Sequence, residues 1–176
     1  MNKVFIGIVI IIIGYVLFNS VNSKAYELVI PENAIRMRVI PNSNSDYDQQ
    51  IKAKVKEVLQ TTTYDLLKDT KGSEEAEKII KANLSLIDNR INDLLVKENY
   101  NLDYKINFGL NYFPDKEFKG VTYTEGYYNS LLVTLGAGEG DNWWCVLFPP
   151  MCLIEAEESE EVEYKFFIQE LLEKYL

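Results

Sequence analysis

The sequence predicts an α+β fold in which two amphipathic helices pack on one face of a mostly antiparallel sheet. An N-terminal signal or anchor helix and an appended C-terminal helix flank this domain. Three observations indicate the class: helical periodicity over residues 51–66 and 76–94, strict alternation over residues 102–112, and two shorter strand-like runs after it. Helices that come first and strands that come later are typical of a layered α+β domain.

The first 23 residues have the composition of an export segment. A short cationic start, residues 1–3, precedes an apolar run over residues 4–18. This run is short for a membrane span, which needs about 20 apolar residues, and residues 21–23 offer a signal peptidase site poorer than Ala-x-Ala. A cleaved signal peptide and a retained N-terminal membrane anchor both stay open. Either one predicts an extracytoplasmic protein, secreted or membrane-anchored.

The first strand and the first helix of the domain lie between residues 35 and 66. Residues 35–39 alternate apolar and basic side chains, which predicts a strand with one buried face. A polar turn follows, and Ser45 with Asp48 three residues later forms a capping-box pattern that opens a helix. Lys52 and Lys56 are expected on the solvent side of this helix. Its expected core face consists of Ile51, Val55, Val58, Leu59, Thr62 and Leu66.

A second helix and the remaining strands complete the domain. Residues 72–75, Gly-Ser-Glu-Glu, break the first helical pattern and place negative charge at the start of a second helix. Residues 102–112 then predict a long strand with one face on the helices, and residues 131–135 and 144–148 predict two further strands. The expected core stripe of the second helix is Ala76, Ile80, Leu84, Ile87, Ile91 and Leu94.

Three segments organise the chain. Residues 1–23 form the signal peptide or membrane anchor, residues 34–154 form one α+β domain, and residues 155–176 form an acidic linker with a C-terminal amphipathic helix. An apolar stripe at helical spacing favours packing of that last helix on the domain over packing on a partner. The stripe consists of Tyr164, Phe167, Ile168, Leu171, Leu172 and Tyr175.

Composition restricts the chemistry open to this chain. Histidine, the commonest general base and transition-metal ligand, is absent, which excludes serine triads and most zinc hydrolase sites. The excess of 27 acidic over 18 basic residues disfavours nucleic acid and anionic lipid headgroups as partners. Carboxylate pairs stay open as an acid and base, but so many acidic residues make any pair uninformative. We therefore expect no enzymatic activity, no cofactor and no metal.

Two motifs begin like ligand-binding loops and then depart from the pattern. Residues 136–140 start like a dinucleotide fingerprint, but no helix follows them, and Glu139 and Asp141 would repel a phosphate. Alternate Asn and Asp side chains at residues 42–48 resemble a calcium loop, yet Tyr47 occupies the place of its required glycine. A connection between strands and a helix cap are the favoured interpretations.

Residues 143–152 form the most unusual stretch. Trp143 and Trp144 point to opposite faces of a strand, and two interpretations stay open: one is an exposed interface anchor, or both are covered. Cys145 and Cys152 are the only cysteines, and the two prolines between them suggest a turn that brings them together. A structural disulfide is favoured over redox catalysis, and two buried free thiols stay open.

Residues 138–152, Gly-Glu-Gly-Asp-Asn-Trp-Trp-Cys-Val-Leu-Phe-Pro-Pro-Met-Cys, resemble the signature of the stage II sporulation protein R family. A match of this length that is rich in Trp, Cys and Pro is hard to obtain by chance. The chain departs from the family pattern at Asn44, at Thr124 and Glu125, and in the acidic tail. The resemblance extends to residues 35–40, 42–43, 48–49, 113–116, 126–128 and 131–136.

The resemblance implies a function as well as a fold. Such proteins are made in the forespore and exported into the space between two membranes. There they activate, by binding, a membrane-embedded aspartic protease that processes the precursor of a mother-cell sigma factor. The resemblance thus implies a protein partner, no nucleic acid, no small-molecule substrate, and membrane contact only through an uncleaved N-terminal segment.

We expect the partner-contact surface near the end of the resembling stretch. Cys145 and Cys152 are expected to support its shape. Two rival functions stay open: a cell-wall hydrolase that uses a carboxylate pair, and a structural envelope protein that acts during engulfment. The expected contact residues are Gly138, Gly140, Asn142, Trp143 and Trp144.

Overall fold

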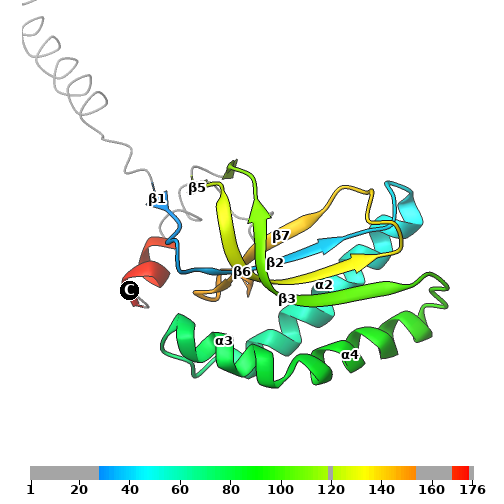
Figure 1. Cartoon of the computed structure of the whole chain (residues 1–176), viewed down its shortest axis with the longest axis horizontal. Helices are drawn as coiled ribbons and strands as arrows, with labels where there is room; N and C mark the ends of the chain where they lie inside the picture. Colours follow the sequence, from blue (N-terminus) through cyan, green and yellow to red (C-terminus); the bar gives the residue numbers. More distant parts are fainter. Residues whose placement is uncertain (1–27, 119–120, 154–167, 175–176) are drawn as a thin grey trace, which may run out of the picture.

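A computed structural model describes residues 28–118, 121–153 and 168–174 (Figure 1). Residues 168–174 are helical. The elements before them are, in chain order, β1 (Leu28–Val29), β2 (Ile35–Ile40), α2 (Asp46–Leu67), α3 (Ser73–Ala82), α4 (Leu84–Lys97), β3 (Tyr104–Phe113), β4 (Lys116–Phe118), β5 (Val121–Tyr123), β6 (Gly126–Leu135), β7 (Trp143–Phe148) and the 3₁₀ turn η1 (Met151–Leu153).

A four-stranded sheet with the order β3-β6-β2-β7 forms the centre of the domain. The pairs β3–β6 and β2–β7 are antiparallel, whereas the central pair β2–β6 is parallel. The predicted α+β class is confirmed, but the sheet is mixed. A parallel neighbour needs a long crossover connection, and here the connection contains α2, α3, α4, β3, β4 and β5. A small sheet of the order β1-β5-β4, made of strands two or three residues long, was not predicted.

The three helices cover one face of this sheet, beneath it in Figure 1. The predicted second helix is two helices, because the chain is interrupted at Asn83, whose side chain donates to the carbonyl oxygen of Ile79 at 2.8 Å. The predicted stripes are shifted by one residue at three positions, since the buried face follows i, i+4 spacing and buries Thr63, Leu67 and Leu95 in place of Thr62, Leu66 and Leu94. Val58 and Leu84, also predicted in the core, are only partly buried. The buried helical residues are Asp48, Ile51, Val55, Leu59, Thr63 and Leu67 in α2, Ala76 and Ile80 in α3, and Ile87, Ile91 and Leu95 in α4.

The long strand β3 follows its predicted alternation over only part of its length. Tyr104, Ile106 and Phe108 pack against the core between sheet and helices. Leu110 and Tyr112 continue the same face but are 69% and 48% exposed. The prediction of one continuous buried face is therefore wrong for the second half of β3. Figure 1 shows the reason, since this half of β3 curls away from the helices together with the start of β6.

A second apolar cluster occupies the opposite face of the sheet. It brings together the residues that precede β2, the strands β5 and β7, and the C-terminal helical residues. Part of the predicted C-terminal stripe therefore packs on the domain. Leu171 of that stripe is partly buried, whereas the acidic run at residues 155–163 and the stripe residues Tyr164, Phe167 and Tyr175 lie outside the described residues. The buried members of this cluster are Ile30, Ala34, Val121, Tyr123, Val146, Met151, Ile168 and Leu172.

Within the described ranges, no helix has the length and apolar character needed to cross a bilayer. The predicted export segment at residues 1–23 lies outside those ranges. The α2–α4 layer is amphipathic, with its apolar side on the sheet and its charged side in solvent.

Candidate interaction surface

The loop between β6 and β7 is tied to the turn that precedes α2. Asn42 accepts the backbone N–H of Ala137 on its side chain at 3.0 Å and that of Glu139 on its carbonyl at 3.1 Å. Asn44 accepts the backbone N–H of Asp141 on its side chain at 2.6 Å. Backbone donors held by side-chain acceptors have few other conformations open to them. The loop is therefore a preformed surface.

Asp48, at the start of α2, organises the turn that holds this loop. Its carboxylate accepts from Ser43 Oγ at 2.5 Å and from Asn42 Nδ2 at 3.0 Å, and its N–H donates to the capping Ser45 Oγ at 3.2 Å. The hydrogen bond from Ser43 is the main reason that the pKa of Asp48 is lowered from its ordinary value, against the opposing effect of burial. Half of the predicted capping box is present, because the carboxylate turns to Ser43 and Asn42 and not to the cap backbone.

Glycines in the loop permit an approach that any side chain would prevent. Gly136 and Gly138 have φ of 54° and 69°, which favours glycine. A Cβ on Gly136 would lie 2.4 Å from Asn42 Oδ1, and one on Gly140 would lie 2.3 Å from the carbonyl oxygen of Ser43. These glycines therefore serve close packing of the loop on the turn.

The loop leads directly into β7 and not into a helix, so its geometry is that of a strand connection. The described residues hold no group of three or more His, Cys, Asp or Glu side chains arranged to bind a metal. The side chains of Glu139, Asp141 and Asn142 are exposed on the loop. Of the predicted contact residues here, Gly138 and Gly140 shape the backbone, and Asn142 is the one with a side chain in solvent.

Trp143 and Trp144 lie on opposite faces of the sheet, and both are half-buried. Trp143 packs against the helical core, with Lys56 Nζ 5.2 Å from the centroid of its ring. Trp144 packs against the second cluster, with the centroid of its ring 5.8 Å from that of Tyr123. Each ring is thus held against the domain and remains partly exposed, which suits an interface anchor.

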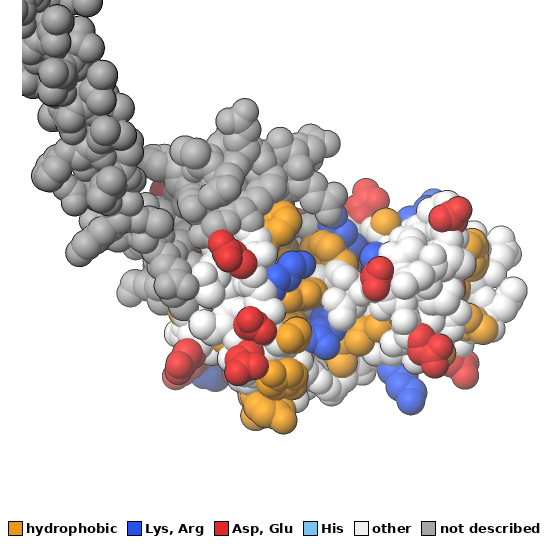
Figure 2. Space-filling model, turned by 90° about the horizontal axis from the view of Figure 1, so that it is seen from above, with side chains coloured by type: hydrophobic (Ala, Val, Ile, Leu, Met, Phe, Trp, Pro, Cys, Tyr) orange, Lys and Arg blue, Asp and Glu red, His pale blue; other side chains and the backbone are white. Residues whose placement is uncertain are grey.

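Arg36, Arg38, Phe113, Tyr128 and Trp144 form a layer on the sheet opposite the helices, here called the arginine face. The guanidinium carbons of Arg36 and Arg38 lie 3.5 Å from the Tyr128 ring centroid and 4.2 Å from the Phe113 ring centroid. Figure 2 looks onto this side of the sheet and shows Lys and Arg side chains among hydrophobic ones. Four segments distant in sequence meet here.

Arg36 is wholly buried, so the prediction that β2 buries only one face is wrong: aromatic rings from β3, β6 and β7 cover its second face at this residue. Burial lowers the pKa of Arg36 and of Arg38 from the ordinary value. Arg36 Nη2 donates to the carbonyl oxygen of Thr124 at 3.0 Å, while its Nε and Nη1 are buried with no hydrogen-bond partner among the described residues. Cation–π contacts with the surrounding rings offset part of the cost of this buried charge.

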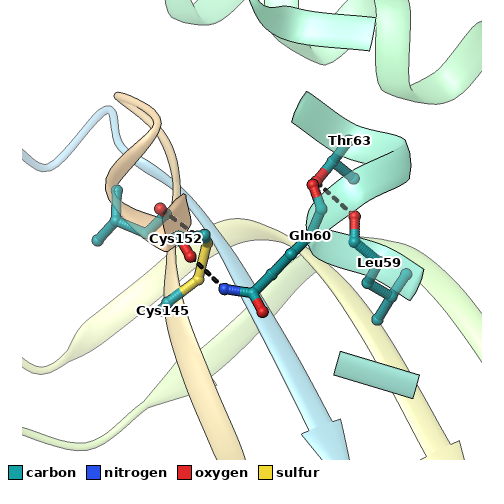
Figure 3. The surroundings of a disulfide bond; sticks show 6 residues. Leu59, Gln60, Thr63, Cys145 and Cys152 are labelled. Carbon is teal, nitrogen blue, oxygen red and sulfur yellow. Dashed lines mark hydrogen bonds between the residues drawn. A yellow bond between two sulfur atoms is a disulfide. The ribbon is translucent and has the colours of Figure 1, made fainter. Parts of the chain in front are cut away.

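Cys145 and Cys152 are joined by a disulfide, with their Cα atoms 5.6 Å apart (Figure 3). The bond links β7 to the η1 turn, and Gln60 of α2 donates from its side chain to the backbone oxygen of Cys152. A cavity of about 10 Å³ adjoins this site and is lined by Gln60, Thr63 and Cys152 among others. The cavity has room for about one water molecule.

The sequence pattern does not predict which residues hold the β6–β7 loop or form the arginine face. Asn42 and Asn44 were interpreted as helix-capping residues, whereas their side chains hold the β6–β7 loop. The signal available in the sequence was the run of hydrogen-bonding side chains over residues 42–49, which is longer than one cap requires. The sequence contains no such indication for Arg36, because alternation along a strand does not show whether other segments cover its second face.

Comparison with known proteins places the chain in a family. The family model described as Stage II sporulation protein R matches residues 31–158. Stage II sporulation protein R of Bacillus subtilis (strain 168) is 37% identical over 141 residues, which cover 80% of this chain and 63% of that protein. No solved structure matches the chain. The chain therefore belongs to the stage II sporulation protein R family, and this membership supports a role in sporulation.

Proposed function

We propose that this protein is an extracytoplasmic signalling protein of sporulation that activates a membrane-embedded aspartic protease by binding it. The protease in turn processes the precursor of a mother-cell sigma factor. In this proposal the chain binds the cleavage-competent state of the protease more tightly than the resting state, and the difference in affinity shifts the equilibrium. The export segment at residues 1–23 and family membership support this proposal.

The observation that carries the proposal is the preformed loop beside the two half-buried tryptophans. Side-chain acceptors hold the backbone of the loop, so little conformational entropy is lost when a partner binds it. The exposed side chain of Asn142 and the partly exposed ring of Trp143 are adjacent in sequence at the start of β7. A rigid polar loop next to an aromatic anchor is the arrangement expected of a binding surface.

The proposal is tested by co-expression of the full chain, the protease and its precursor substrate in a host that does not sporulate. Trp143→Ala and Trp144→Ala are compared with Tyr64→Ala, which removes a 45% exposed aromatic ring from α2. Precursor cleavage should be lost for at least one tryptophan variant and retained for the Tyr64 variant, with thermal unfolding showing that all are folded. Retained cleavage in both tryptophan variants would overturn the assignment of this surface.

Two further measurements separate the rival functions. Clearing of peptidoglycan by the purified domain in a zymogram would support a cell-wall hydrolase and contradict the proposal. A change in engulfment morphology that precedes any defect in sigma-factor processing would instead support a structural envelope protein.

A further inference from the structure

Three large apolar side chains stand in solvent where β3 and β6 leave the helices. Tyr127 is 72% exposed, Leu110 is 69% exposed and Tyr112 is 48% exposed. The rings of Tyr112 and Tyr127 meet edge to face across the strand pair, with centroids 5.6 Å apart. These three residues, here called the β3 patch, lie together, unlike the single exposed apolar residues that are common on protein surfaces.

Among the described residues, the same place carries a sheet edge that pairs with no further strand. β3 is an outer strand of the four-stranded sheet, and it pairs with β6 in unbroken register from Tyr104 to Phe113. Its ten residues contain no proline and one charged residue, Lys105. Natural edge strands are usually protected by charges, prolines, bulges or short length. On its outer side, β3 has none of these devices from residue 106 onward.

The other outer strand offers a contrast. β7 is six residues long, and the disulfide of Cys145 with Cys152 folds the chain that follows it back as the η1 turn. One edge of the sheet is thus short and followed by a cross-linked turn, while the other is long and regular. An edge that lacks such protection over residues 106–113, beside an apolar patch, is the arrangement that accepts an added strand.

We propose that the β3 edge binds an extended segment of a partner protein, which adds to the sheet as a fifth strand. This inference rests on the proposed function, since the segment belongs to the protein that the chain activates. The segment pairs with the outer backbone groups of β3, and its alternate apolar side chains contact Leu110 and Tyr112. Near this edge, the exposed acidic residues Asp103, Asp115 and Glu125 outnumber the exposed basic residues Lys105 and Lys116, so the segment carries no net negative charge.

A second copy of the chain fits this edge less well. The chain carries a net charge of −9, and pairing of two β3 edges would bring both sets of acidic flanks together. Partner pairing and self-pairing differ in how they depend on concentration, so one experiment separates them.

The first test is a matched pair of substitutions in the full chain. Leu110→Lys places a charge in the β3 patch, and Val96→Lys places one at the 68% exposed Val96 of α4. Binding to the detergent-solubilised protease should weaken about tenfold or more for the Leu110 variant and stay unchanged for the Val96 variant. Equal affinity of both variants, with unchanged thermal unfolding, would overturn the inference.

The second test reads the backbone directly by hydrogen–deuterium exchange of the full chain, alone and with the solubilised protease. The outward N–H groups of residues 106–112 should exchange quickly in the free chain and slowly in the complex. Binding without protection of β3 overturns this inference and leaves the proposed function standing, whereas no binding overturns both. Protection that grows with the concentration of the chain alone would show self-pairing and would also overturn the inference.

Discussion

The guanidinium group of Arg36 stacks on the ring of Tyr128, with its central carbon 3.5 Å from the ring centroid. This contact brings the parallel neighbours β2 and β6 together on the face opposite the helices. The charge is wholly buried, and no carboxylate pairs with it among the described residues. The stabilisation that a buried guanidinium gains from aromatic rings depends more on the planar shape of the group than on its charge.

Substitution of Arg36 separates shape from charge. Arg36→Lys should lower the free energy of unfolding by about 1–3 kcal/mol, because lysine keeps the charge and loses the stacking and the bond to Thr124. Arg36→Met removes the unpaired charge and keeps much of the volume, so it should be less destabilising than lysine. Urea unfolding measures both, and a lysine variant as stable as the parent chain would contradict this account.

Asp48→Asn should destabilise the turn that holds the β6–β7 loop. Loss of the charge-assisted hydrogen bonds from Ser43 and Asn42 should lower the free energy of unfolding by about 1.5–3 kcal/mol at neutral pH. Asp46→Asn is the control, because Asp46 lies in the same helical turn and is exposed.

The effect of Asp48 should also depend on pH. Its pKa is lower in the folded chain than in the unfolded chain, so its contribution is complete above the unfolded value of about 3.9 and declines as pH falls through the folded value. The stability of the parent chain and of Asp48→Asn should therefore converge in acid. If urea unfolding gave the same difference in stability between the parent chain and Asp48→Asn from pH 7 to pH 2, the ionised Asp48 carboxylate would not be the source of the stabilisation.

Gly140→Ala tests the close approach of the loop to the turn. A Cβ at this position would meet the carbonyl oxygen of Ser43 at 2.3 Å, so the loop must shift, and partner activation should fall together with stability. Gly72→Ala is the control, because a Cβ there would meet no described atom within 4 Å. Thermal unfolding and precursor cleavage are measured on both variants. Equal unfolding temperatures and equal cleavage in the two variants would contradict the prediction.

The disulfide should stabilise the domain by restricting the unfolded chain. Loss of the eight-residue loop in a Cys145→Ser and Cys152→Ser double variant should cost about 2.5 kcal/mol in the chain-entropy model. A reductant should lower the stability of the parent chain to that of the double variant and leave the variant unchanged. Urea unfolding with and without reductant measures this, and insensitivity of the parent chain to reductant would contradict the prediction.

Much of the fold was predictable because it depends on local periodicity. The buried stripe of α2 and the alternation in β2 report which residues share a face, and that information is contained in short windows. The opposite orientation of Trp143 and Trp144 follows from the same period of two. Each of these predictions concerns neighbours in sequence.

Features that depend on distant partners could not be predicted in this way. The burial of Arg36 depends on Tyr128 and Trp144, and the exposure of Leu110 depends on where the helix layer ends. The parallel pairing of β2 with β6 likewise depends on the path of the chain between them. Alternation assigns a residue to a face, whereas packing of remote segments decides whether that face is covered.

The position of β2 at the centre of the sheet has a consequence for the order in which the domain can assemble. Met37 in β2 pairs with Leu131 of β6 on one side and with Cys145 of β7 on the other. β2 therefore has no neighbouring strand until β6 and β7 are present. A chain threaded N-terminus first through a narrow pore cannot complete its sheet until residue 148 has passed. A product truncated before β7 lacks an outer strand of the four-stranded sheet and cannot complete it.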